Sequence, residues 1–151
     1  MSHIILLLHA MTGMLFILAC VWVYVETLNC TEKNLPRIRT MCTVAAVLMW
    51  TTFIVGGYWY VFFYAPDKAV ILKGPWPIAH NFFMEAKEHI VLMLLPLSVF
   101  LPIVASNNLP SVPSARKLLL WAAGTAIVIG VAMEGAGAII SMGAKLALLP
   151  A

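Results

Sequence analysis

Four long stretches of this chain contain almost no charged side chain, and this feature constrains the fold more than any other. The stretches are 4–25, 41–65, 89–106 and 118–144, and only the last is interrupted, by Glu134. A helix needs about 20 mainly apolar residues to cross the hydrocarbon core of a bilayer. The sequence therefore predicts an all-α integral membrane protein with four transmembrane helices.

The expected spans lie at about 4–27, 40–65, 78–105 and 116–143. The third span is expected to begin before its uncharged stretch, because Pro77 suits the first turn of a helix. The connecting segments are rich in proline and glycine and too short to form a second domain. We therefore expect residues 1–151 to form one up-down-up-down bundle of four helices.

The composition excludes several other classes of protein. Apolar residues make up 63% of the chain and charged residues 10%, whereas soluble domains carry about 25% charged residues. The net charge of +3 without a basic run makes nucleic acid an unexpected partner. Three cysteines with no C-x-x-C or C-x-x-C-H motif exclude a disulfide scaffold, a zinc ribbon and covalently attached c-type haem.

Basic residues in the loops predict the orientation in the membrane. The side opposite the termini carries five of the nine: Lys33, Arg37, Arg39, Arg116 and Lys117. The side of the termini carries the other four: Lys68, Lys73, Lys87 and Lys145. Because cytoplasmic loops are enriched in lysine and arginine, both termini are expected outside.

Ionisable residues collect in the half of the bilayer nearest the termini. His9 lies about 6 Å inside the first span at 1.5 Å per residue. His89 and Glu134 are expected at a similar depth in the third and fourth spans, and Glu85 and Glu88 complete the group. Inserting such a side chain costs at least ~2.5 to 3.5 kcal/mol, so it usually faces the bundle interior and has a partner or a task.

Helical spacing divides this group between faces. Glu85 and His89 are four residues apart and share one face, whereas Glu88 lies about 100° away from His89. His80 precedes His89 by nine residues and is expected on the opposite side. His9 and His89 are therefore the pair expected to face each other from neighbouring helices.

Two inward histidines suggest a b-type haem between spans one and three. Such a haem needs two imidazoles at one depth and small residues where the flat ring meets a helix. Gly13 follows His9 by one turn on the same face. Glu134 or Glu85 would accept the other imidazole N–H, as the neighbours of ligand histidines generally do.

Two other interpretations remain open. Glu85, His89, Glu134 and His9 would also suit a carboxylate and imidazole site for a metal ion, or a proton relay. Alternatively, the protein is a cofactor-free accessory or assembly subunit of a larger membrane complex. In that case the same side chains make hydrogen bonds between helices, and small residues such as Gly130 and Gly137 pack against other helices.

The first span, with Leu6-Leu7-Leu8-His9-Ala10-Met11-Thr12-Gly13, resembles the opening helix of small bacterial four-helix membrane families. These include copper-resistance D-type proteins, the membrane protoporphyrinogen-oxidase type and four-helix b-type cytochromes. The likeness implies His9 as a haem ligand and His89 as a second one. The Trp-Gly pair of the copper-resistance type is absent, which argues against a copper role. Glu26 and Asn29 stand where the protoporphyrinogen-oxidase type has a basic residue, which argues against that activity.

Together these observations predict a membrane electron-transfer subunit with one haem b. It would exchange electrons with other membrane or periplasmic redox subunits, or with a quinone. The bacterial inner membrane is the expected location. The loops are too short for a substrate domain, so we expect a non-catalytic subunit of an oxidoreductase complex and not an enzyme in its own right.

Overall fold

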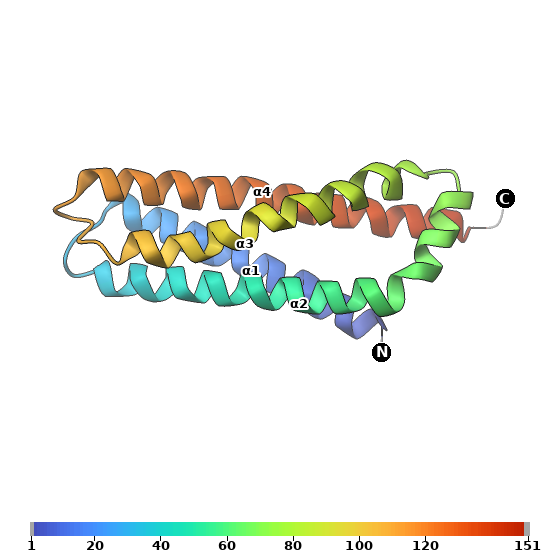
Figure 1. Ribbon diagram of the computed structural model, residues 1–151, viewed down its shortest axis with the longest axis horizontal. Coiled ribbons are helices and arrows are strands. Elements are labelled where there is room, and N and C mark those ends of the chain that lie inside the picture. The colour runs from blue at the N-terminus through green and yellow to red at the C-terminus, as the bar shows by residue number, and fades with distance from the viewer. Residues whose placement is uncertain (1, 150–151) are drawn as a thin grey trace.

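The computed structural model describes residues 2–149, and all of its regular secondary structure is helical. The four main helices are α1 (Ser2–Leu28), α2 (Leu35–Lys73), α3 (Glu85–Ala105) and α4 (Pro113–Ala147). A short π-helix, η1 (Ala79–Met84), runs directly into α3. Figure 1 shows the four helices side by side, with both termini at one end and the α1–α2 and α3–α4 loops at the other.

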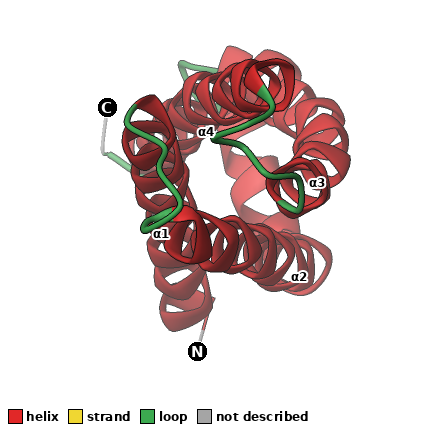
Figure 2. Cartoon of the chain, turned by 90° about the vertical axis from the view of Figure 1, so that its left-hand side faces the viewer, coloured by secondary structure: helices red, strands yellow, loops and turns green. Residues whose placement is uncertain are grey.

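Viewed from the loop end, the helices form a ring in chain order (Figure 2). Contacts join α1 to α2, α2 to α3, α3 to α4, and α4 back to α1. Proline lies in the first turn of both α2 and α4. Backbone N–H groups in a first turn form no hydrogen bond within the helix, so proline, which lacks the N–H, costs no bond there. The predicted up-down-up-down bundle is confirmed.

All four helices are long and apolar enough to cross a membrane. Large apolar side chains also cover the outside of the bundle, among them Leu7, Val61 and Val128, which are 59%, 70% and 71% exposed. An exposed apolar surface of this extent is the surface that lipid tails solvate. These helices and this surface are those of an integral membrane protein.

The second helix is longer than the expected span. We expected it to end at Pro66, but α2 continues through Pro66 to Lys73. Proline removes one backbone donor and favours a bend, and it does not have to end a helix. Figure 1 shows the last part of α2 turning across the end of the bundle. There Ile71 is fully buried, and Gly74 lies against Ala147 of α4.

Two clusters of buried side chains form the core. The larger one extends from the loop end to the middle of the bundle and includes Phe16, Ile38 and Leu119. The smaller one lies near the termini and includes Trp59 and Tyr64. The site described below is lined by residues that belong to both clusters, so it lies between them.

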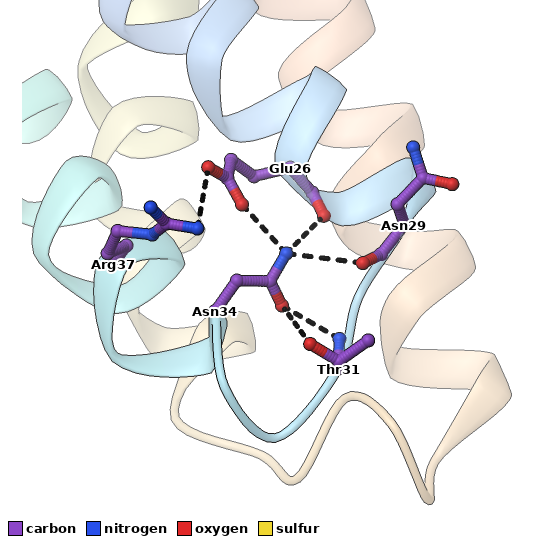
Figure 3. Close-up of polar contacts among 5 residues, drawn as sticks. All are labelled: Glu26, Asn29, Thr31, Asn34 and Arg37. Carbon is purple, nitrogen blue, oxygen red and sulfur yellow. Dashed lines mark hydrogen bonds and ion pairs between the residues drawn. The ribbon is translucent and has the colours of Figure 1, made fainter.

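Polar side chains tie the loop end together (Figure 3). The Asn34 amide donates to the Glu26 carboxylate at 2.7 Å and accepts from the Thr31 backbone N–H at 2.7 Å. Arg37 forms an ion pair with Glu26 at 3.4 Å. These contacts hold the short turn between α1 and α2.

Two further arginines at this end bond to helix termini. Arg39 donates to the carbonyl oxygens of Ala105 and Ser106, at 2.9 and 3.0 Å. Arg116 donates to the carbonyl oxygens of Thr27, at 3.0 Å, and Leu28. The last carbonyls of a helix have no partner within the helix, and a cation there also favours the helix dipole. Each arginine therefore stabilises the end of another helix.

Candidate functional site

A cavity of about 480 Å³ lies inside the half of the bundle nearest the termini. All four helices contribute to its wall. Most lining side chains are apolar, including Phe53, Trp59 and Val91, but five can ionise: His9, Tyr60, Lys87, Glu88 and Glu134. Ligand sites of this size, apolar with a few converging polar groups, are typical of small-molecule binding.

The His9 ring is fixed by contacts with α2. Its Nδ1 lies 2.9 Å from the Thr52 carbonyl oxygen. A carbonyl only accepts, so Nδ1 carries the proton and Nε2 of the neutral ring is an acceptor. The ring lies against Gly56, where an added Cβ would come within 2.5 Å of Nδ1. Among residues 2–149, Nε2 has no hydrogen-bond partner, so it is available to a ligand or a proton.

Glu134 reaches from α4 to the surface of α1. Its Oε1 occupies the space where a Cβ at Gly13 would stand, so a larger residue there would push the end of the Glu134 side chain aside. Gly13 itself is buried. The one-turn spacing of His9 and Gly13 thus places an imidazole and a carboxylate on the same side of α1.

Lys87 extends from α3 toward α4. Its Nζ would be 3.0 Å from a Cβ at Gly137, which is one turn beyond Glu134. The ammonium group is close enough to interact electrostatically with both His9 and Glu134. Within the described chain, however, neither Lys87 nor Glu134 forms an ion pair within 4.0 Å.

Two buried oxygens at the site have no hydrogen-bond partner among the described residues: Thr52 Oγ1 and Glu88 Oε1. Glu88 lines the cavity beside the Tyr60 hydroxyl, and Thr52 lies next to both His9 and Gly13. A buried polar atom without a partner costs free energy, and in native proteins it usually binds water, an ion or a ligand. The Glu88 oxygen, on a residue that lines the cavity, is therefore available to a polar group there.

The structure does not bring His89 to the cavity. His89 is exposed on the outside of α3, and its Nδ1 lies 2.7 Å from the Glu85 carbonyl oxygen in the preceding turn. Glu85 is exposed on the same face. The inward face of α3 carries Lys87, Glu88 and Val91. The expected pairing of His9 with His89 is therefore not present, and Glu85 does not support the His9 ring.

A haem held by two imidazoles does not fit these residues. His9 has the Nδ1 contact typical of a ligand histidine, but the other three described histidines face elsewhere. His3 and His89 are exposed, and His80 is buried against Tyr64. The predicted metal set is also divided, since Glu85 and His89 lie apart from His9 and Glu134. In residues 2–149, no three His, Cys, Asp or Glu side chains come together as metal ligands do.

His80 forms a second polar cluster beside the cavity. Its Nδ1 lies 3.0 Å from the Tyr64 hydroxyl, and its Nε2 lies 3.7 Å from Glu85 Oε1. The sequence predicts His80 on the side opposite His89, and the structure agrees, since His80 is buried and His89 is exposed. The helix at His80 is not an α-helix, however, because His80 lies in the π-helix η1. In a π-helix residues five apart come together, so His80 and Glu85 share a face.

Sequence reasoning did not place Lys87 at the site, and it set Glu88 aside. One signal was present: Met84, Glu88, Val91 and Leu95 follow each other at helical spacing, and this stripe faces inward.

Comparison of the chain with known protein families, with curated proteins and with solved structures gave no match. The function is therefore argued from the site alone.

Proposed function

We propose that this protein binds a lipid-soluble molecule of the quinone class in the cavity and exchanges protons with it. The observation that carries the proposal is the joint placement of His9, Lys87, Glu88 and Glu134 around one apolar cavity. Each ionisable side chain inside a membrane is costly, and such residues mark ligand or proton pathways. A protein that only packs against other subunits does not need four ionisable side chains around one cavity.

The chemistry of a quinone head matches the side chains of the cavity. The carbonyl oxygens of the oxidised form are acceptors, which Lys87 and Tyr60 can serve as donors. The hydroxyl groups of the reduced form are donors, which the carboxylates of Glu88 and Glu134 can accept. Phe53 and Trp59 offer apolar contact to the ring. Leu92 and Ser141 are cavity residues that are also exposed, so an apolar tail can leave toward the lipid.

In this proposal the chain is a membrane subunit of a redox complex, and a partner subunit supplies or removes the electrons. We place it in the bacterial inner membrane with both termini outside, as the loop charges favour. The cavity then lies in the outer half of the bilayer. Protons exchanged with the ligand would enter or leave on that side.

Haem b stays a prediction, supported by one side chain. The Nδ1 contact of His9 with the Thr52 carbonyl leaves Nε2 available to iron. A reduced absorption spectrum with b-type bands that His9→Ala abolishes and His89→Ala leaves unchanged would support a haem with His9 as its single histidine ligand. Absence of porphyrin after haem-replete expression would remove this reading and leave the quinone proposal intact.

The proposal is tested by fluorescence titration of the protein in lipid nanodiscs with a short-tailed benzoquinone. Trp59 lines the cavity, whereas Trp121 is 77% exposed in a separate pocket between α1 and α4. We expect saturable quenching that Trp59→Phe removes and Trp121→Phe retains. The variants Lys87→Met and Glu134→Gln should weaken binding about tenfold, the loss of one hydrogen bond to a charged group.

As a matched control, Lys145→Met removes an exposed lysine from the same end of the bundle. It should bind as the unmodified protein does. Quenching that never saturates, or that is the same in Lys87→Met, Glu134→Gln and Lys145→Met, would contradict the proposal and favour a cofactor-free accessory subunit.

A further inference from the structure

A row of polar side chains leads from the outside of the bundle toward the cavity. Glu85 lies at the outer end, with about half of its side chain exposed. His80 follows at 3.7 Å and Tyr64 at a further 3.0 Å, and both are almost completely buried, at 3% and 2% exposure. The ionisable side chains of the cavity lie further inside the bundle.

Tyr64 also packs against a residue of the cavity wall. The rings of Tyr64 and Tyr60 are stacked, with centroids 5.2 Å apart and an interplanar angle of 23°. Tyr60 and Glu88 both line the cavity. The unpartnered Oε1 of Glu88 is therefore the inner end of the row.

From this arrangement we infer that Glu85, His80 and Tyr64 form a proton path between the aqueous surface and the cavity. The inference rests on the proposed function for its purpose, because a quinone that is reduced or oxidised must take up or release protons. The path itself is a property of the described side chains. Its direction is set by whichever end holds the more acidic group.

Each transfer moves one proton and no electrons. Glu85 passes a proton to His80 Nε2, and the imidazole releases its Nδ1 proton to the Tyr64 oxygen. Tyr64 releases its own hydroxyl proton toward Tyr60 and Glu88. His80 is left as the other tautomer, and a reverse transfer or a ring flip restores it. Imidazole suits this role because its two nitrogens act on opposite sides and its ordinary pKa is near neutral. A water molecule can bridge the last step from Tyr64 to the Tyr60 and Glu88 pair.

The π-helix explains why these side chains meet. In a regular α-helix, residues five apart point in different directions, and His80 would not face Glu85. The wide turn of η1 brings them together and lets His80 reach Tyr64 of α2. Isolated π-helical turns are frequent at functional sites. Other ionisable groups near Tyr64 are Asp67 on its own helix and Glu88 on α3.

The test uses a hydroxynaphthoquinone, whose visible colour reports its own protonation. Its affinity for the protein in nanodiscs measures the proposed function, and the rate of its colour change after a pH jump measures proton access to the cavity. We expect Tyr64→Phe and His80→Phe to retain affinity and to slow the colour change about tenfold or more, as loss of an acid–base group does. Tyr58→Phe and His89→Phe, at exposed positions, should leave the rate unchanged.

A second readout needs no ligand. Infrared absorption of the carboxyl groups after the same pH jump reports the protonation of Glu88. The band of Glu88 is assigned by its loss in the variant Glu88→Gln. Glu85→Gln alters only an exposed position and should slow this signal while the protein stays folded. Equal rates in the unmodified protein, Tyr64→Phe and Glu85→Gln would overturn the inference. If the naphthoquinone does not bind but these variants slow the infrared signal, the path stands and the quinone proposal fails.

Discussion

The two ends of the bundle use their polar side chains in opposite ways. At the loop end, Asn34, Arg39 and Arg116 donate to carboxylate or carbonyl oxygens of other segments. At the cavity end, Lys87 and Glu134 face a cavity and form no ion pair within 4.0 Å in residues 2–149. Partnered groups stabilise a fold, whereas buried groups without partners reduce its stability and are available to a ligand. Substitutions should therefore affect stability at one end and binding at the other.

The largest effect on stability is expected at Asn34. This side chain is 7% exposed and bonds to three residues: Glu26, Asn29 and Thr31. Asn34→Leu should reduce the free energy of unfolding by about 3 kcal/mol, because several hydrogen bonds of about 1 kcal/mol each are lost. Thermal unfolding measures the loss, and quinone affinity should not change.

The matched control is Asn108→Leu in the other loop at this end. Asn108 is exposed, and only its backbone carbonyl accepts hydrogen bonds from described residues. Its substitution should leave the Tm nearly unchanged. Equal Tm values for the two variants would contradict the structural role of Asn34.

At the cavity end, two adjacent glycines should differ. A methyl group at Gly56 would stand 2.5 Å from the His9 ring, whereas one at Gly57 would meet nothing within 4 Å. Gly56→Ala should displace the ring from the Thr52 carbonyl and weaken quinone binding about tenfold, the effect of losing roughly one hydrogen bond. Gly57 also lines the cavity, but its methyl group would leave the His9 ring in place, so Gly57→Ala should weaken binding less than Gly56→Ala does. Comparing the two affinities tests whether the position of His9 matters.

Lys87→Met should have the opposite effect on stability to Asn34→Leu. It removes a partly buried ammonium group that has no counter-ion within 4.0 Å among residues 2–149, so the free energy of unfolding should rise by about 1 kcal/mol, while quinone affinity falls. Thermal unfolding of the ligand-free protein checks the sign. If the Tm of Lys87→Met is lower than that of Lys145→Met, Lys87 stabilises the fold. The contrast between the two ends of the bundle would then be wrong.

The smallest effect concerns Cys30, in the loop between α1 and α2. Burial raises the pKa of this thiol, and the nearby Arg116 guanidinium lowers it by less. Since the thiolate is the reactive form, maleimide should label Cys30 more slowly than a free peptide cysteine at neutral pH, and faster as the pH rises. Arg116→Met should slow labelling further. Faster labelling of that variant would mean that the loop had opened.

Much of the fold could be predicted from the sequence, because the length of an uncharged stretch determines whether it can span a bilayer. The positions of the ionisable residues within these stretches also predicted that they collect in the half of the bundle nearest the termini. The continuation of α2 through Pro66 could not be predicted, since proline either ends a helix or bends it. The contacts of Ile71 with the rest of the core decide between the two.

The candidate site was predicted in part. His9, Gly13 and Glu134 lie together, as expected of residues at one depth in the membrane, and the Glu134 carboxylate lies against Gly13. His89 was placed on the wrong side of α3. Lipid is as apolar as the interior, so hydrophobic periodicity does not show which face of a membrane helix points inward. The π-helical register of His80 has no signal in the sequence.

The most direct test of the central claim uses a photoactivatable short-tailed benzoquinone and identifies the labelled residues by mass spectrometry. Saturable labelling within the cavity-lining segments 53–60, 84–92 and 133–141 is the expected result, reduced in Lys87→Met and unchanged in Lys145→Met. Labelling that is spread over the lipid-facing surface, or that concentrates at Trp121 in the separate pocket, would contradict a ligand site in the cavity.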